Sequence, residues 1–236
     1  MALDHEVSAN HLRPTAELAE RVLLPGDPAR ALAVAQALLE RPPQMFNHAR
    51  GLWGYTGTAS DGEPLTVQAT GMGGPSAAIV CEELITLGAT LLVRIGTCGA
   101  LDPSIELGTL LAAESVIPAD GASAALGAGA ALEPDPGLLK RLVAAGARPV
   151  TVATSDLFYD PREGVAAGWA ERGAVAVEME AATILQVAAR HGVAAACVLG
   201  VSDVASSNGA RRMSRDELAE LGVRIGEAGY AAVRSP

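Results

Sequence analysis

Two arginines occupy positions at which a cation is costly unless an anion compensates it. The run LLPGDPAR places Arg30 at the third position of a predicted helix, behind Asp27 as N-cap and near the positive end of the helix dipole. The run LLVRIGT places Arg94 inside an apolar strand, where an unpaired charge costs about 3–5 kcal/mol. Gly26 and Thr97 add backbone N–H groups and a hydroxyl. The pattern predicts one site for a doubly charged anion such as phosphate, and a structural ion pair to an internal carboxylate remains the alternative for Arg94.

A second group of chemically active side chains is the pair of carboxylates in AVAVEMEAATI. Glu178 and Glu180 flank Met179 at the predicted start of a helix, and their spacing is expected to point them in different directions. They are therefore not predicted to act as a paired acid and base. Each carboxylate can interact favourably with the positive end of the helix dipole. It can instead accept hydrogen bonds from both hydroxyls of a vicinal diol such as that of a ribose.

Polar side chains also follow other predicted strands, where ligands collect in open α/β sheets. Ser202 and Asp203 end the strand VLGVSD, and Asp203 is either a turn former or a general acid that donates a proton to a leaving group. Phe158, in TSDLFYDP, either packs in the core or stacks on a planar base. The residues alone leave both alternatives open.

The composition of the chain limits the kind of partner. The formal net charge of −10 and the absence of a Lys/Arg cluster argue against a nucleic acid, so a small-molecule partner is expected. The sequence lacks a basic and apolar leader and an apolar run long enough to span a bilayer, so we expect a cytoplasmic protein without a membrane partner. The three cysteines are far apart, which predicts reduced thiols in or near the core and no paired metal motif.

The elements that must position these side chains alternate between strand and helix. This alternation predicts a single α/β domain over residues 1–236, a three-layer α/β/α sandwich. The central β-sheet should be mixed, because Asp61-Gly62 between two strand-like runs is typical of a type I′ hairpin turn. The Ala-, Gly- and Pro-rich segment 119–137 is expected to be a loop. Further strands are predicted at 22–24, 90–95, 109–117, 148–153 and 194–201, and helices at 29–40, 75–88, 136–146, 180–191 and 214–233.

Seven motifs occur in an order that resembles one known family. They are LLPGDPAR, HARGLWGYTG, TGMGGPSAAI, RIGTCGA, SDLFY, VEMEAA and VSD. Together they resemble the nucleoside phosphorylase-I family, specifically its hexameric bacterial purine nucleoside phosphorylases, over nearly the whole chain. The resemblance implies cleavage of the N-glycosidic bond of a purine nucleoside by phosphate, without a metal or organic cofactor. It also implies a homo-oligomer, a hexamer built as a trimer of dimers.

The resemblance assigns roles to individual residues. The phosphate ligands are implied to be Gly26, Arg30, Arg94 and Thr97, together with Arg50 lent to the site of a neighbouring subunit. Glu180 is implied to bind the ribose 2′- and 3′-hydroxyls beside Met179, with Glu178 in a lesser role. His11 matches a histidine that reaches the 5′-hydroxyl across the dimer, although the spacing is one residue short and His5 is a rival. The residues implied to surround the base are Cys98, Gly99, Phe158, Val177 and Ser202.

Asp203 is then expected to protonate N7 of the departing purine, because bond cleavage leaves negative charge on the base. The resemblance implies Arg215 as a cation that assists it. That match also requires a one-residue gap, and Arg211 and Arg212 stand nearby.

Three other functions are consistent with the same residues. A uridine phosphorylase is suggested by Thr97 and by ADGAS, but the pyrimidine-selecting Gln and Arg of that branch have no evident counterpart. A 5′-methylthioadenosine phosphorylase or nucleosidase of the same fold is the second, although a nucleosidase gives no reason for three arginines. The third is a non-catalytic protein that binds phosphate or a nucleoside.

Overall fold

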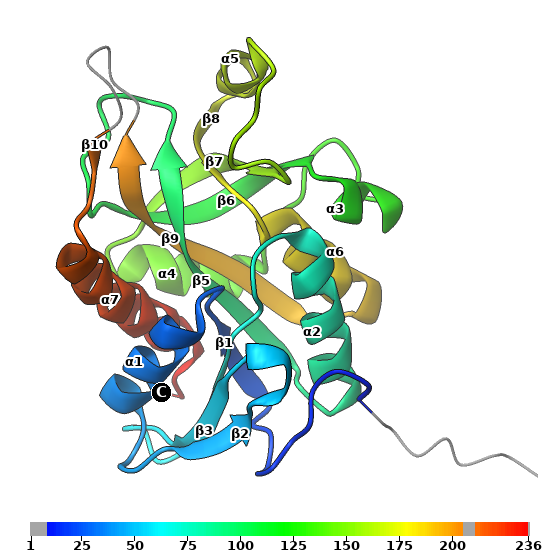
Figure 1. Cartoon of the computed structure of the whole chain (residues 1–236), viewed down its shortest axis with the longest axis vertical. Coiled ribbons are helices and arrows are strands. Elements are labelled where there is room, and N and C mark those ends of the chain that lie inside the picture. The colour runs from blue at the N-terminus through cyan, green and yellow to red at the C-terminus, as the bar shows by residue number, and fades with distance from the viewer. Residues whose placement is uncertain (1–8, 205–210, 236) are drawn as a thin grey trace, which may run out of the picture.

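The computed structural model describes residues 9–204 and 211–235, and within them one mixed β-sheet is covered by helices on both faces (Figure 1). One face carries α1 (Pro28–Leu38), α4 (Pro136–Ala144) and α7 (Arg215–Val233). The other face carries α2 (Gly74–Thr86), α3 (Gly121–Ala125) and α6 (Ala181–His191), while α5 (Val165–Glu171) lies beyond one end of the sheet. The predicted three-layer fold with a mixed sheet is confirmed.

The sheet combines parallel and antiparallel pairings. Its order is β10-β9-β6-β7-β8-β5-β1-β4-β3-β2. The pairs β1–β4, β1–β5, β5–β9, β6–β7 and β7–β8 are parallel, and β2–β3, β3–β4, β5–β8, β6–β9 and β9–β10 are antiparallel. The strands are β1 (Arg21–Leu24), β2 (Gln44–Asn47), β3 (Gly54–Thr58), β4 (Pro64–Gln68), β5 (Leu91–Ala100), β6 (Leu110–Ala119), β7 (Arg148–Ser155), β8 (Ala174–Glu178), β9 (Ala194–Val204) and β10 (Arg211–Arg212).

Five strands of this sheet close into a ring. Strand β9 pairs with both β6 and β5, and β8 connects β7 back to β5. The closure is narrow, since β8 pairs with β5 only at Gly99–Val177 and Ala100–Ala176. This ring brings the end of β5 beside the ends of β8 and β9, so residues far apart in the sequence meet at one point.

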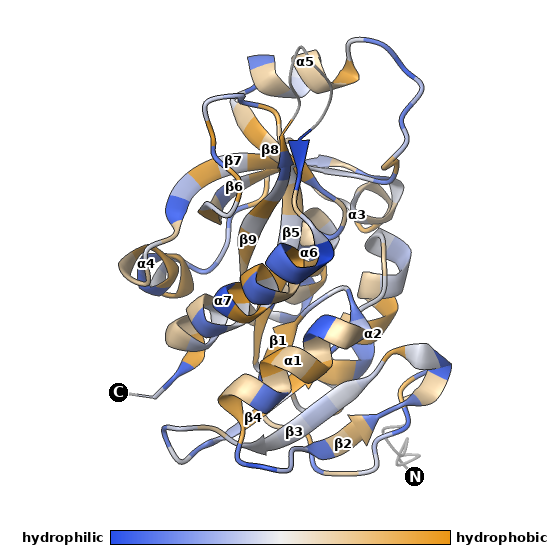
Figure 2. Cartoon of the chain, turned by 60° about the vertical axis from the view of Figure 1, so that its left-hand side comes forward, coloured by the Kyte–Doolittle hydropathy of each residue, from blue (hydrophilic) through white to orange (hydrophobic). Residues whose placement is uncertain are grey.

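Apolar residues on both faces of the sheet hold the helices in place. The α2 and α6 side of the sheet includes the fully buried Leu84 and Ile184, and the α1, α4 and α7 side includes Val34, Leu138 and Ile225. The strands near the centre of the sheet are largely hydrophobic, whereas α7 alternates hydrophobic and hydrophilic residues along its length (Figure 2). That pattern is typical of a helix with one face on a core and one in water.

Arg21 of β1 forms a largely buried ion pair with the β3–β4 turn and a hydrogen bond with the end of the last helix. Arg21 donates to both carboxylate oxygens of Asp61, at 2.5 and 2.7 Å, and to the carbonyls of Glu63 and Pro64. Its Nη1 also donates to the carbonyl of Val233 at 3.1 Å, near the C-terminal end of α7. The hydrogen bonds from Arg21 hold the pKa of Asp61 well below its usual range.

The structure corrects two local predictions. The β3–β4 hairpin forms, but Gly62 N–H donates to Ala59 O and Ala59 N–H donates to Glu63 O, with φ 83° at Gly62. This is a type I turn followed by a glycine bulge, and the predicted type I′ turn is wrong because Asp61 would need a positive φ. The expected loop 119–137 contains α3, which begins at the N-cap Asp120, so that interpretation was only partly correct.

The predicted strands that carry polar residues at their ends are longer than expected. β5 continues past Ile95 to Ala100, and β9 continues past Val201 to Val204. These two strands pair with each other along almost their whole length, so their polar residues stay in the ladder. Thr97 and Asp203 therefore sit on strands and not on flexible connections, which fixes their positions more firmly.

Candidate functional site

A cavity of about 730 Å³ opens at the carboxyl ends of β5, β8 and β9. Its volume falls within the range of small-molecule sites. It brings together the predicted residues Gly26, Arg30, Arg94, Thr97, Cys98, Gly99, Phe158, Val177, Glu178, Met179, Glu180, Ser202 and Asp203. His11, Arg50 and Arg215 do not line it.

The residues predicted to hold an anion, Gly26, Arg30, Arg94 and Thr97, all line this cavity. Asp27 caps α1 by accepting a hydrogen bond from Ala29 N–H at 2.9 Å, and Pro28 begins the helix, as predicted. The side chain of Arg30 lies against Gly222 of α7, where a Cβ would come within 3.3 Å of its Cγ and Nε. Burial and the charge of Arg94 lower the pKa of Arg30, because two cations share a poorly solvated place. The two arginines therefore lie close enough for their charges to interact.

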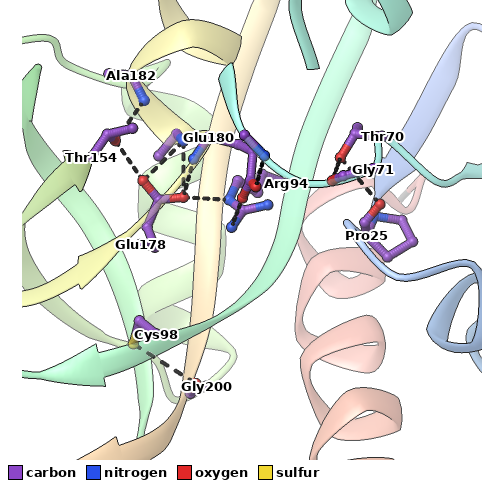
Figure 3. A network of polar contacts seen from close by, with 12 residues as sticks. Pro25, Thr70, Gly71, Arg94, Cys98, Thr154, Glu178, Glu180, Ala182 and Gly200 are labelled. Atoms are coloured by element: carbon purple, nitrogen blue, oxygen red, sulfur yellow. Dashed lines mark hydrogen bonds and ion pairs between the residues drawn. The ribbon is translucent and has the colours of Figure 1, made fainter. Parts of the chain in front are cut away.

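Arg94 forms the ion pair with an internal carboxylate that the sequence left as the alternative to an anion ligand, and it does so with two carboxylates (Figure 3). Nε of Arg94 donates to Glu178 at 2.8 Å, and Nη2 pairs with Glu180 at 2.5 Å. Burial alone would lower the pKa of Arg94, but the charges of Glu180 and Glu178 outweigh it and raise that pKa. The expectation that the two carboxylates point in different directions is wrong. Both converge on Arg94, because Glu178 ends a strand and Glu180 begins the helix that turns back over it.

Glu178 and Glu180 differ in their remaining partners. Glu178 accepts hydrogen bonds from the hydroxyl of Thr154 and from the backbone N–H groups of Glu180 and Ala181, so it caps α6. Its side chain is 0% exposed. Glu180 accepts from Gly73 N–H at 2.6 Å, just ahead of α2, where Gly73 adopts φ 88°. Glu178 is therefore mainly structural, whereas Glu180 is the carboxylate with acceptor capacity left.

Asp203 owes its position to a bulge between β5 and β9. Cys98 pairs with Val201, and the next pair is Gly99 with Asp203, so Ser202 is the extra residue. A Cβ on Gly99 would lie 2.8 Å from Oδ2 of Asp203, which explains why glycine stands there. The hydroxyl of Ser202 donates to Asp203 at 3.0 Å or to the carbonyl of Cys98 at 3.2 Å. The bulge thereby directs the Asp203 side chain toward the cavity.

The structure brings a different arginine to the cavity than the one that spacing implied. Arg212 lines the cavity and pairs with Asp203 across the β9–β10 ladder, and its guanidinium carbon lies 5.3 Å from the centroid of the Phe158 ring. Arg215 is exposed at the start of α7, behind the N-cap Ser214. The sequence signal that could have distinguished the two arginines is the capping box of Ser214 and Glu217. It sets the start of the helix at Arg215 and therefore places Arg212 in the segment before the helix.

Aromatic and apolar side chains complete the cavity mouth. Phe158 is 55% exposed and makes an edge-to-face contact with Tyr159, at 4.9 Å between ring centroids. Its alternative role as a core residue is therefore wrong. Sequence reasoning missed Met72, Leu101, Leu157, Tyr159 and Trp169, which also line the cavity.

The segments that carry His11 and Arg50 are linked to each other outside the cavity lining. The carboxylate of Glu83 accepts hydrogen bonds from His11 Nδ1 at 2.6 Å and from the backbone N–H groups of residues 10–12. Arg50 is exposed and adopts φ 58° within the turn Ala49–Gly51. Oδ1 of Asn47 accepts from Arg13 N–H and Ala49 N–H, which ties the two segments to each other. The rival His5 lies outside the described residues.

The three cysteines have the environment that their spacing predicted. Cys81, Cys98 and Cys197 are free and buried. Burial raises the pKa of the Cys81 thiol to about 12. Within residues 9–204 and 211–235, no cluster of three or more His, Cys, Asp or Glu side chains is placed to hold a metal ion. The helices of the same residues include none with the length and apolar character needed to cross a membrane.

Comparison with known proteins assigns this arrangement to a family. Residues 20–234 match the family model described as "Phosphorylase superfamily". A purine nucleoside phosphorylase (DeoD-type) of Geobacillus kaustophilus is 39% identical over 198 residues, which cover 80% of this chain and 83% of that protein. A DeoD-type enzyme of Caldanaerobacter subterraneus is 40% identical over 196 residues, 79% of this chain and 84% of the other. A crystal structure of uridine phosphorylase from Vibrio fischeri shares the fold at a TM-score of 0.79, with 23% identity, and the match covers 91% and 90% of the two chains.

Proposed function

Since this chain belongs to the phosphorylase superfamily, we propose that it is a purine nucleoside phosphorylase. The reaction cleaves the N-glycosidic bond of a purine ribo- or deoxyribonucleoside with phosphate and gives the free base and (deoxy)ribose 1-phosphate. The observation that carries the proposal is one cavity that holds two arginines, a carboxylate with free acceptor capacity and an aspartate on a bulge. The sequence similarity to enzymes named for this activity supports it.

Phosphate is the nucleophile in this scheme. Arg30 and Arg94, with the backbone at Gly26 and the hydroxyl of Thr97, bind it on one wall of the cavity. An oxygen of phosphate forms the new bond to C1′ as the bond from C1′ to N9 breaks, and the electron pair of that bond leaves with the base. Guanidinium groups suit this anion because their N–H donors match phosphate oxygens.

The sugar and the base bind on either side of the bond that breaks. Glu180 accepts the 2′- and 3′-hydroxyls, and Met179 lies beneath the ribose. The purine stacks on Phe158 beside Cys98, Gly99 and Val177. Asp203 in its acid form gives a proton to N7, so the base departs neutral. Arg212, or Arg215 after a movement of the start of α7, stabilises the carboxylate that remains.

The complete site includes residues from a second subunit. His11 and Arg50 lie away from the cavity of their own chain, and Asn47 links the segments that carry them through Arg13 N–H and Ala49 N–H, which suits joint insertion of the two segments into a neighbour. We propose a cytoplasmic homo-oligomer, a hexamer built as a trimer of dimers. The scheme uses phosphate as a co-substrate and needs no cofactor, metal or nucleic acid.

A substrate panel tests this proposal against its alternatives. The purified protein is incubated with inosine, adenosine, uridine or 5′-methylthioadenosine, with and without phosphate, and release of the base is followed. Phosphate-dependent release from inosine or adenosine is expected. Release without phosphate identifies a nucleosidase, release from uridine alone identifies a uridine phosphorylase, and no release from any substrate leaves a binding protein.

A further inference from the structure

Arg94 binds two carboxylates through separate nitrogen atoms and leaves its third nitrogen without a partner among the described residues (Figure 3). Nε donates to Glu178 at 2.8 Å and Nη2 pairs with Glu180 at 2.5 Å. Nη1 has no hydrogen-bond partner among the residues that the structure describes, although Arg94 is only 3% exposed. A buried donor without an acceptor is unfavourable. Since Arg94 lines the cavity together with Arg30, Nη1 marks the place where an anionic ligand supplies the missing acceptor.

The two carboxylates that bind Arg94 differ in how many other hydrogen bonds they accept. Glu178 accepts hydrogen bonds from Thr154, from the backbone of Glu180 and Ala181, and from Arg94, which uses its acceptor capacity almost fully. Its hydrogen bond to Nε fixes the base of the guanidinium. Glu180 has two partners, Gly73 N–H and Nη2 of Arg94. The Glu180 contact is thus the one that can be exchanged without dismantling the start of α6.

The charges around Glu180 favour such an exchange. Burial raises the pKa of Glu180, and the charge of Arg94 opposes that effect. Arg30 also lies close enough to act on the charge of Glu180. A phosphate dianion that binds Arg30 and Arg94 supplies the negative charge that Glu180 otherwise supplies. The carboxylate of Glu180 then becomes available to other donors.

We propose that phosphate takes over Arg94 from Glu180, and that this handover prepares Glu180 to bind the hydroxyls of the nucleoside. Phosphate occupies Nη1 and competes for Nη2, while Glu178 acts as a positioning residue that keeps Arg94 in place through Nε. This inference rests on the proposed function. Its consequence is that phosphate and nucleoside bind with positive cooperativity, and by linkage each raises the affinity of the other by the same factor.

Equilibrium binding of a purine C-nucleoside tests the handover without turnover. Its carbon–carbon glycosidic bond resists phosphorolysis, so its Kd is measured by calorimetry without phosphate and at saturating phosphate. Phosphate is expected to lower that Kd by a factor of about 5–150, the usual range for linked sites. In Glu180→Gln the factor is expected to fall to about 1, because the ion pair with Arg94 is gone. The same C-nucleoside lacking its 2′- and 3′-hydroxyls is expected to show no phosphate effect in the wild-type protein.

A matched control and a separate activity assay make the outcome decisive. Glu82→Gln removes a glutamate of α2 that is 38% exposed and does not line the cavity, and it is expected to keep the full phosphate effect. An equal Kd with and without phosphate in the wild-type protein, in a preparation that phosphorolyses inosine, overturns the handover and leaves the proposed function intact. A phosphate effect of the same size in Glu180→Gln also overturns it. Failure to phosphorolyse any nucleoside overturns the proposed function and the handover together.

Discussion

Asp203 and Arg212 are direct partners across the antiparallel pairing of β9 and β10. Residues opposed in this way present their side chains on the same face, within about 5.5 Å between Cβ atoms. The guanidinium of Arg212 also lies 5.3 Å from the ring centroid of Phe158. The cation is therefore next to both the expected proton donor and the expected stacking ring.

This placement predicts that Arg212 assists Asp203. Arg212→Ala is expected to lower kcat for inosine by about 10-fold or more, because a neighbouring cation stabilises the carboxylate left after proton transfer. Arg215→Ala is expected to cost less. Arg211→Ala is the matched control, since Arg211 is exposed and pairs opposite Val204. If Arg215→Ala shows the larger loss in steady-state kinetics, the cation comes from α7 and not from β10.

Asp203 is expected to act on the leaving base and not on phosphate. Asp203→Asn should lower kcat for inosine by about 10²–10⁴-fold and leave the KM for phosphate largely unchanged. A nucleoside already methylated at N7 carries its positive charge there and needs no proton. The variant should therefore cleave 7-methylinosine nearly as well as the wild-type protein. Equal losses on both substrates would show that Asp203 does not protonate N7.

Arg30 is expected to bind phosphate. Hydrogen bonds to charged groups contribute about 1.5–3 kcal/mol, and every 1.4 kcal/mol is about tenfold. Arg30→Ala should therefore raise the KM for phosphate about 10- to 100-fold. Arg41→Ala removes an exposed arginine that follows the same helix and donates to Gln36 O, and it should leave that KM unchanged. An unaltered phosphate KM in Arg30→Ala contradicts the placement of the anion.

Subunit mixing tests whether Arg50 serves a neighbouring site. Arg50→Ala and Asp203→Asn are each expected to be nearly inactive alone. In co-expressed mixtures, a site with its own Asp203 receives Arg50 from an Asp203→Asn neighbour, so activity should reappear. Mixtures that stay as inactive as the two parents would place Arg50 outside the shared site.

The ion pair of Arg21 with Asp61 predicts a specific response to acid. The folded-state pKa of Asp61 lies below its ordinary value of 3.8, so the pair contributes stability above that pH and loses it as pH falls toward the lower value. Asp61→Asn should lower stability at neutral pH by about 3 kcal/mol. The difference in Tm from the wild-type protein should shrink below pH 3.8. Asp160→Asn, which breaks the pair with the largely exposed Arg162, should change Tm little.

The sequence was most informative where a residue conflicts with its local environment. A charge in an apolar strand indicated that Arg94 needs a negative partner, either a bound anion or an internal carboxylate, and a cation at a helix start marked Arg30, which lines the same cavity. Both residues could be found from local sequence, because a short run of residues defines the strand around Arg94 and the helix start before Arg30. The order of motifs supplied the family, since each motif keeps its place along the chain.

Features that depend on the pairing of distant strands could not be predicted from local sequence. The convergence of Glu178 and Glu180 on Arg94 requires β8 to end beside β5, and β8 was not predicted at all. The bulge at Gly99 that aims Asp203 results from the pairing of two strands about 100 residues apart. Arg212 reaches the cavity only through β10, a strand of two residues that carries no periodic signal.

The hydrogen bond from Arg21 to Val233 gives the chain an order of assembly. β1 lies in the middle of the sheet, yet the donors of Arg21 are satisfied only when the last turn of α7 is in place. During synthesis the ribosome therefore releases one of the acceptors of Arg21 only at the very end of the chain. A nascent chain that stops before residue 233 keeps the ion pair of Arg21 with Asp61 but lacks the Val233 carbonyl that accepts from Nη1 of Arg21.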